Sequence, residues 1–190
     1  MMGESIIDIS KEAKKLNSSE LSIVRNIADN IITNSIGTKN RIRKGLKHVR
    51  WFHSIKFHPP TNSYFKTNKK AEIKKILKFT ISDPDVYQIH KHNNSHYRLL
   101  IKKTLISRDA RNLINNDTLG MDPQGNCLNN VILIFSIDNI CSLRDSLEHG
   151  ELLTAFPTFK KYDISMIDKY ISPFKGHLLK LKSNERYYIV

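Results

Sequence analysis

The chain has 190 residues with 31 Lys plus Arg against 18 Asp plus Glu, and its formal net charge of +13 at pH 7 favours polyanionic partners, nucleic acid before anionic membrane. Two cysteines, Cys127 and Cys141, are too few and too loosely spaced for a disulfide framework or a zinc site, which fits action in the cytoplasm. No run approaches the roughly 20 apolar residues of a bilayer span, and the N-terminus lacks a signal-peptide pattern, so we expect no membrane span and, for an exported protein, a non-classical secretion route.

The length suits one compact domain, with a basic helical part expected over residues 1–60 and an α+β part over residues 61–190. Apolar residues recur at helical spacing from Leu21 to Ile32, after the cap-like Ser18, and predict a first helix. A second helix is predicted from Lys39 to about Ile55. Four cations fall on one face of it: Lys39, Arg43, Lys47 and Arg50. This basic stripe could lie along phosphates or could be a solvated surface.

Three histidines follow one another at intervals of five residues, beside the single tryptophan Trp51: His48, His53 and His58. A spacing of five residues on a helix points side chains apart, which argues against a metal site at this position. Imidazoles are suited to proton transfer near neutral pH, and the surrounding cations favour the neutral form that acts as a base. The alternative for each histidine is a packing role.

A helix from Lys69 to Phe79 precedes a predicted β-hairpin. Its two strands are expected over Val86–Ile89 and His96–Leu105. In the second strand Arg98 and Lys102 share a face because side chains alternate with a period of two. Cations on a sheet face suit phosphate binding, and ordinary solvent exposure is the alternative.

Two later segments are typical of neighbouring strands. Asn130–Ile137 is a short, β-branched, apolar run that predicts a buried central strand. Gly150–Pro157 stops at a proline that cannot donate to a ladder. The two-residue period predicts Leu152, Thr154 and Phe156 on one face of this strand. Thr154 would then present a hydroxyl at the strand's end, or serve only as a strand former.

A closing helix is expected over residues 164–171 and a last strand within residues 175–182. The predicted fold class is α+β, with N-terminal helices packed on a small, mainly antiparallel sheet of four or five strands. We expect Val131–Ile137 to be central in that sheet and paired with the strand that carries Thr154.

Five short segments between residues 69 and 161 carry a family resemblance: Ala71-Glu-Ile-Lys-Lys-Ile-Leu77, Asp83-Pro-Asp-Val86, Tyr97-Arg-Leu-Leu-Ile-Lys102, Val131-Ile-Leu-Ile-Phe135 and Leu153-Thr-Ala-Phe-Pro157. The series resembles the phage and polymorphic-toxin nuclease domains of the barnase, EndoU, colicin and RelE-like (BECR) superfamily. Related metal-independent RNases often place Ser or Thr two residues before an aromatic on the final strand. Thr154 and Phe156 match this, with Phe where Tyr is usual. The sequence lacks the glycine-flanked histidine pair of the EndoU branch.

The resemblance implies an endoribonuclease of toxin or effector type that needs neither metal nor cofactor. The ribose 2′-hydroxyl would attack the adjacent phosphate, which requires a base, an acid and cations around the phosphorane. The implied catalytic residues are His53, His58, Arg98, Lys102 and Thr154, with His48, His90, His92 and His96 as alternative histidines. Trp51 and Phe156 would stack on nucleobases, and the basic stripe would contact the RNA backbone.

RNA is the implied substrate, and toxins of this superfamily often cut tRNA. Two other functions remain open from the residues themselves. One is a non-enzymatic nucleic-acid-binding module that docks its N-terminal helices on phosphates. The other is an effector whose basic surface binds an acidic protein, such as an immunity or inhibitor protein.

Overall fold

The computed structural model describes residues 18–34, 45–91, 97–137, 150–159, 178–182 and 185–189. Its helices are α1 (Ser18–Asn34), α2 (Gly45–Phe52), α3 (Lys70–Ser82) and α4 (Ser107–Ile114). Its strands are β1 (Tyr64–Phe65), β2 (Val86–Lys91), β3 (Tyr97–Thr104), β4 (Gly120–Met121), β5 (Cys127–Leu128), β6 (Asn130–Ile137), β7 (Glu151–Thr158), β8 (Leu178–Lys182) and β9 (Glu185–Ile189). The closing helix expected over residues 164–171 lies outside the described residues.

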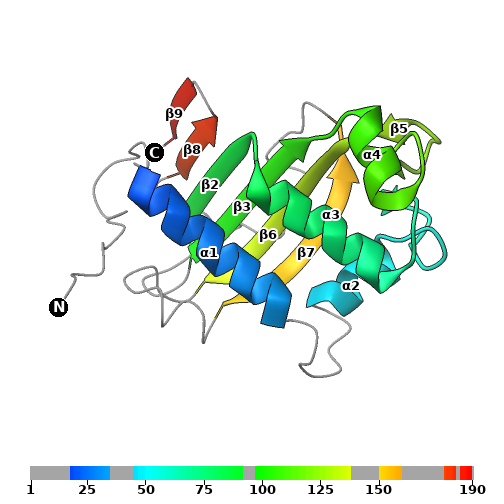
Figure 1. The fold of residues 1–190 in the computed structure, drawn as a ribbon, viewed down its shortest axis with the longest axis horizontal. Helices are drawn as coiled ribbons and strands as arrows, with labels where there is room; N and C mark the ends of the chain where they lie inside the picture. The colour runs from blue at the N-terminus through cyan, green and yellow to red at the C-terminus, as the bar shows by residue number, and fades with distance from the viewer. Residues whose placement is uncertain are drawn as a thin grey trace.

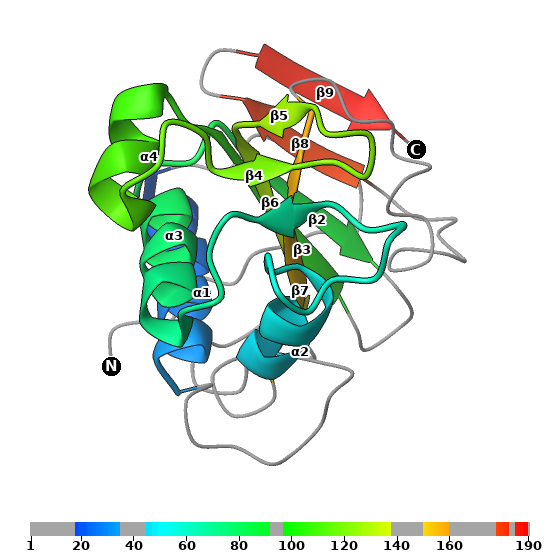
Figure 2. The same ribbon diagram turned by 90° about the vertical axis from the view of Figure 1, so that its right-hand side faces the viewer.

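In the described part of the chain, six strands form an antiparallel sheet in the order β7-β6-β3-β2-β8-β9, and a second, small sheet has the order β1-β4-β5. Helices α1 and α3 lie along one face of the large sheet (Figures 1 and 2). The predicted α+β class is confirmed, as is the interior position of β6 beside β7. The expected four or five strands were too few, because the C-terminal residues contribute β8 and β9 where the sequence indicated one strand.

The main core lies between α1, α3 and the large sheet. The buried residues of α3 recur at the spacing of one helical face: Ile73, Ile76, Leu77, Thr80 and Ile81. The Thr80 hydroxyl donates to the Ile76 carbonyl at 2.8 Å, so this buried polar group is satisfied within the helix. None of the helices in the described ranges has the length and apolar character that a bilayer crossing requires.

The described part of the second predicted helix is α2, which ends at Phe52 rather than near Ile55. Leu46 and Val49 of α2 are buried in the main core. Beyond Phe52 the chain turns, and Ser54 forms an isolated parallel bridge with Phe65 of β1. The position at which α2 ends determines where the side chains of the histidines after it, His53 and His58, lie.

The two faces of the large sheet carry different side chains. Leu99 and Ile101 of β3 pack with α1 and α3 in the main core. Leu100, between them, points the other way and packs with Ile132 and Ile134 of β6. The face turned away from α1 and α3 is called the far face below. Through the strand register it carries Arg98, Leu100, Lys102, Ile132, Ile134, Thr154 and Phe156.

A β-bulge interrupts the pairing of β6 with β7. Ile134 lies opposite Thr154, but the next residue, Phe135, lies opposite Leu152, so Leu153 is the extra residue. Leu152 therefore packs in the main core, whereas Thr154 lies opposite a residue of the far face. The expectation that Leu152 shares a face with Thr154 and Phe156 was wrong, because the two-residue period does not continue through a bulge.

β7 is an edge strand of the large sheet, which permits a proline because an edge position needs no donor. α2, β1 and β4 lie against β7. At Gly120 in β4, an added Cβ would lie 2.5 Å from Pro157 Cγ and 2.7 Å from the Tyr64 carbonyl oxygen. The close approach of the small sheet to β7 therefore requires glycine at this position.

Candidate functional site

The site begins where α2 meets β7. His53 directly follows α2, and its backbone N–H donates to the Val49 carbonyl at 2.8 Å. Its side chain is only 5% exposed. The imidazole packs against the ring of Phe156 on β7, with ring centroids 5.3 Å apart and planes at 33°. The end of α2 thus places a histidine against the far face of the sheet.

A backbone carbonyl sets the tautomer of His53. Nδ1 lies 3.0 Å from the Ser63 carbonyl oxygen. Because a carbonyl oxygen only accepts, Nδ1 carries the proton in this contact. In the neutral ring the lone pair then resides on Nε2, the nitrogen that can take up a proton. His53 therefore has the tautomer that a general base requires.

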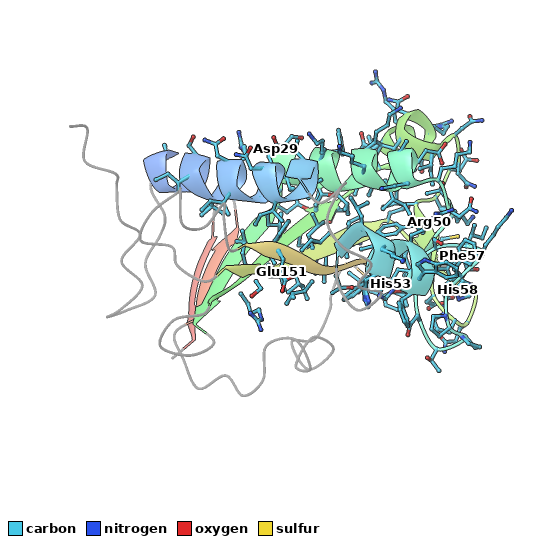
Figure 3. All side chains as sticks on the ribbon, turned by 90° about the horizontal axis from the view of Figure 1, so that it is seen from below. Asp29, Arg50, His53, Phe57, His58 and Glu151 are labelled. Carbon is cyan, nitrogen blue, oxygen red and sulfur yellow. The ribbon has the colours of Figure 1, made fainter. Side chains whose placement is uncertain are left out.

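The other two histidines of this segment lie in different surroundings. The His48 ring stacks on Phe52 and meets His53 edge-on, with ring centroids 4.8 Å and 5.6 Å away. The expectation that the spacing of five separates these side chains was wrong for His48 and His53, because the helix ends between them. His58 stacks on Tyr64, with centroids 3.8 Å apart, and its Nδ1 lies 3.0 Å from the Pro59 carbonyl oxygen. Figure 3 shows His53 and His58 near α2.

Arg98 and Lys102 share the far face, as their alternation predicted. One guanidinium nitrogen of Arg98, Nη1, donates to Ser136 Oγ of β6 at 2.7 Å. Lys102 is half-buried. His90 on β2 is the register partner of Arg98. His92 and His96 lie outside the described residues.

The strand register places these cations relative to β7. Lys102 lies opposite Ile132, which lies opposite Phe156, so the three residues form one row across the sheet. Neighbouring strands are about 4.8 Å apart, so the backbones of Lys102 and Phe156 are separated by roughly 10 Å. A lysine side chain can cross much of that separation. The far face thus brings a cation and the His53–Phe156 pair into one region.

Thr154 lies on the far face but does not reach its surface. Its side chain is 0% exposed, and its Oγ1 has no hydrogen-bond partner in the part of the chain that the structure describes. Its register partner Ile134 is also buried. The expectation that Thr154 presents its hydroxyl at the surface is not met in this structure, because the whole residue is buried.

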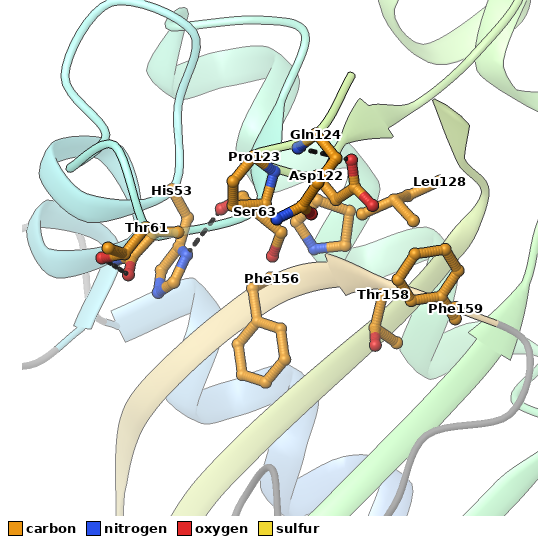
Figure 4. Close-up of a pocket in the computed structure, with 12 residues that line it drawn as sticks. His53, Thr61, Ser63, Asp122, Pro123, Gln124, Leu128, Phe156, Thr158 and Phe159 are labelled. Carbon is orange, nitrogen blue, oxygen red and sulfur yellow. Dashed lines mark hydrogen bonds between the residues drawn. The ribbon is translucent and has the colours of Figure 1, made fainter. Parts of the chain in front are cut away.

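A cavity of about 300 Å³ opens beside His53 and Phe156 (Figure 4). It lies between the end of β7 and two loops, residues 61–63 and 122–124. Thr158, the next residue of β7 in the alternation, also lines it. Among the predicted site residues that the structure describes, His53 and Phe156 line the cavity, whereas His58, Arg98, Lys102 and Thr154 do not.

One loop of the cavity is built around Asp122, which is 5% exposed. Its Oδ1 accepts the backbone N–H groups of Gln124 and Asn126 at 3.0 and 2.7 Å, and its Oδ2 accepts the Asn126 side-chain amide at 2.9 Å. Burial alone would raise the pKa of Asp122, but these hydrogen bonds outweigh it and hold the pKa below its usual value near 3.8. Asp122 therefore stays ionised and shapes the loop.

Comparisons with protein-family models, with curated proteins and with solved structures find no match. Membership of the BECR superfamily stays a prediction.

The surface of α2 carries only part of the predicted basic stripe. Lys39 and Arg43 lie outside the described residues, and Lys47 is exposed. Arg50 is half-buried: its Nε donates to the Asn68 carbonyl at 3.1 Å and its guanidinium lies 5.7 Å from the Phe57 ring centroid. Trp51 packs on Phe57 yet stays 42% exposed. Arg50 thus anchors α2, while Lys47 and Trp51 remain accessible.

Sequence reasoning missed two residues that shape the cavity, Thr158 and Asp122. Thr158 continues the alternation of Thr154 and Phe156, so extending that pattern by one step would have found it. Asp122 sits in the turn Asp122-Pro-Gln-Gly-Asn126, where an aspartate before a proline is typical of a side-chain-stabilised turn. No local pattern brings these two residues together.

Proposed function

We propose that this protein is a metal-independent endoribonuclease that cleaves RNA by transesterification through the ribose 2′-hydroxyl. One observation carries the proposal: His53, in the tautomer of a general base, packs on Phe156, and Lys102 lies in the row of Phe156 on the far face. Arg98 lies on the same face, four residues from Lys102 along β3. A base, an aromatic surface and two cations are the components that this reaction uses.

In the proposed reaction Nε2 of His53 accepts the proton of the 2′-hydroxyl as the oxygen attacks phosphorus. Lys102, in the row of Phe156, donates a proton to the departing 5′-oxygen as the P–O bond breaks. Arg98, whose Nη1 donates to Ser136 Oγ, contributes positive charge that stabilises the phosphorane oxygens. The products are a 2′,3′-cyclic phosphate and a 5′-hydroxyl. Neither Thr154, which is buried, nor His58, which lies outside the cavity lining, is assigned a contact with RNA.

The test is digestion of total RNA by the purified full-length chain, with and without EDTA. We expect fragments that end in cyclic phosphate and that form equally well in EDTA. Intact RNA at micromolar protein, or cleavage abolished by EDTA, would overturn the proposal. Matched variants of His53 and His58, described in the Discussion, separate genuine activity from a contaminating nuclease.

A second function, a non-enzymatic nucleic-acid-binding module, is favoured by the burial of Thr154 together with the exposure of Lys47 and Trp51 on α2. A cation beside an accessible indole suits a phosphate contact next to a stacked base. This function predicts RNA that shifts in a gel but remains intact. Replacing Lys47 and Trp51 with alanine would then remove the shift.

A further inference from the structure

We propose that the cavity at the end of β7 binds one nucleobase of the RNA, with Thr158 as the residue that recognises its polar edge. This inference rests on the proposed function for the identity of the ligand as RNA. The cavity volume, about 300 Å³, is at the lower end of the range for small-molecule sites and large enough for one heterocyclic base.

The walls of the cavity suit a flat, uncharged ring. His53 and Phe156 contribute aromatic surface on one side, and Leu128 and Pro157 contribute aliphatic surface. Phe159, which is 46% exposed, stands at the other side of the opening (Figure 4). Bases stack on aromatic side chains whatever their sequence, so these walls would hold a base without choosing among bases.

A polar group inside the cavity supplies the selectivity. Thr158 is 3% exposed, and its Oγ1 has no hydrogen-bond partner within the described ranges. Buried hydroxyls normally have a partner, and one that lines a cavity without a partner is suited to pair with a ligand. A hydroxyl both donates and accepts, so it can bond to an amino group, a ring nitrogen or a carbonyl of a base.

Charge argues for a base rather than a phosphate in the cavity. The ionised Asp122 lines it, and its oxygens already accept hydrogen bonds within the loop. A carboxylate repels a phosphate group, whereas a neutral base has no net charge for it to repel. Arg98 and Lys102 are absent from the lining. The sugar and phosphate of the same nucleotide would therefore lie outside, toward the row that contains Lys102 and Phe156.

The chain contains a close control for Thr158. Thr154 is on the same strand and the same face, is equally buried, and also has an Oγ1 without a partner among the described residues, but it does not line the cavity. Thr158→Val and Thr154→Val each remove one hydroxyl and keep the shape of the side chain. Thr158→Ser keeps the hydroxyl.

The experiment measures binding of the free nucleosides adenosine, guanosine, cytidine and uridine by titration calorimetry or NMR. They carry no phosphate, so binding through the cations is avoided. We expect at least one nucleoside to bind the wild type at millimolar concentration or better. Thr158→Val should weaken it at least fivefold, and Thr158→Ser and Thr154→Val less than twofold. Phe159→Ala should weaken the binding of every bound nucleoside several-fold. Because Phe159 is at an exposed position, this variant still tests the cavity when a Thr158 variant does not fold.

The outcomes separate this inference from the proposed function. Nucleoside binding that depends on Thr158, without RNA cleavage, would keep the base pocket and overturn the ribonuclease. Cleavage with no nucleoside binding to the wild type would keep the ribonuclease and overturn the pocket. Equal losses of nucleoside affinity in Thr154→Val and Thr158→Val would also overturn the base pocket, because the effect would then come from a general destabilisation of β7.

Discussion

The imidazole of His53 and the phenyl ring of Phe156 pack at a centroid distance of 5.3 Å, although more than a hundred residues separate them in the sequence. The first follows the end of α2 and the second lies on the edge strand β7. Because both side chains are largely buried, each restricts the other, and the Ser63 carbonyl fixes the remaining rotation of the imidazole. The contact joins the helical part of the chain to the sheet at the proposed reaction site.

Replacing His53 with glutamine should lower the cleavage rate at least a hundredfold, since glutamine keeps a polar side chain of similar length but cannot take up the proton. RNA affinity should change less than threefold. Single-turnover cleavage and filter binding measure the two effects. His58→Gln is the control, because His58 stacks on Tyr64 away from the cavity lining. Equal losses in both variants would show that the assignment of His53 as base is wrong.

Thr154→Val should stabilise the fold by about 1 kcal/mol, because a buried hydroxyl without a partner is costly and valine fills the same space. Cleavage should change less than twofold. Urea unfolding and the cleavage assay provide the measurements. A large loss of activity at unchanged stability would restore Thr154 to the catalytic site.

Removing Arg98 and Lys102, two cations of the far face, should reduce the salt dependence of RNA binding. Each phosphate contact contributes a slope of about 0.7 in a plot of log affinity against log salt for single strands. The double change of Arg98 and Lys102 to glutamine should thus lower the slope by about 1.4. The charge-matched control changes Lys70 and Lys75, two exposed lysines of α3, and should leave the slope close to that of the wild type. A control that lowers the slope equally would mean that RNA contacts the α3 side of the sheet instead.

The Asp122 loop should make stability depend on acid pH. The pKa of Asp122 in the folded chain lies below its usual value near 3.8, so its stabilising contribution is complete above that value and is lost as the pH falls through the folded pKa. Asp122→Asn should be less stable than the wild type at pH 7, and the difference should shrink toward pH 2. Midpoints of urea unfolding, measured for the wild type and the variant between pH 7 and pH 2, test this prediction. A difference independent of pH would mean that the ionised carboxylate is unimportant.

Gly120→Ala should destabilise the fold by about 3 kcal/mol, because the new Cβ would overlap the Pro157 ring and the Tyr64 carbonyl. Gly125→Ala is the comparison: its φ of +83° strains an alanine, but nothing lies within 4 Å of the added carbon, so a cost of about 1 kcal/mol is expected. Thermal unfolding of both variants gives the two values. Similar costs would show that β4 can move away from β7.

The parts of the structure that follow from local patterns were predictable. The buried face of α3 and the shared face of Arg98 and Lys102 each depend on a short period in the sequence. The bulge at Leu153 was not predictable, because it depends on how β7 pairs with β6. The side chains of β7 that precede the bulge lie on the opposite face from the one that a two-residue period predicts. The contact of His48 with His53 depends on where α2 ends, which a helical period does not specify.

The cavity was beyond sequence reasoning for a related reason. Its walls come from five separate segments, none of which carries a binding motif alone: residue 53 after α2, the loop at 61–63, the loop at 122–124, residue 128 of β5 and residues 156–159 at the end of β7. Thr154 shows the reverse case. Its motif with Phe156 pointed to the strand and face that border the cavity, but burial depends on the whole fold, and the threonine that lines the cavity is Thr158, four residues further along.

The packing of α2 and the small sheet against β7 has a consequence for how the protein associates with other molecules. The unpaired side of an edge strand is a template on which a strand of another molecule can add. Here Pro157 withholds a donor, and Gly120 allows β4 to approach so closely that its backbone lies beside the proline ring. The strand that carries Phe156 and Thr158 is thereby protected from strand addition, so its side chains remain available to a ligand rather than to a neighbouring β-sheet.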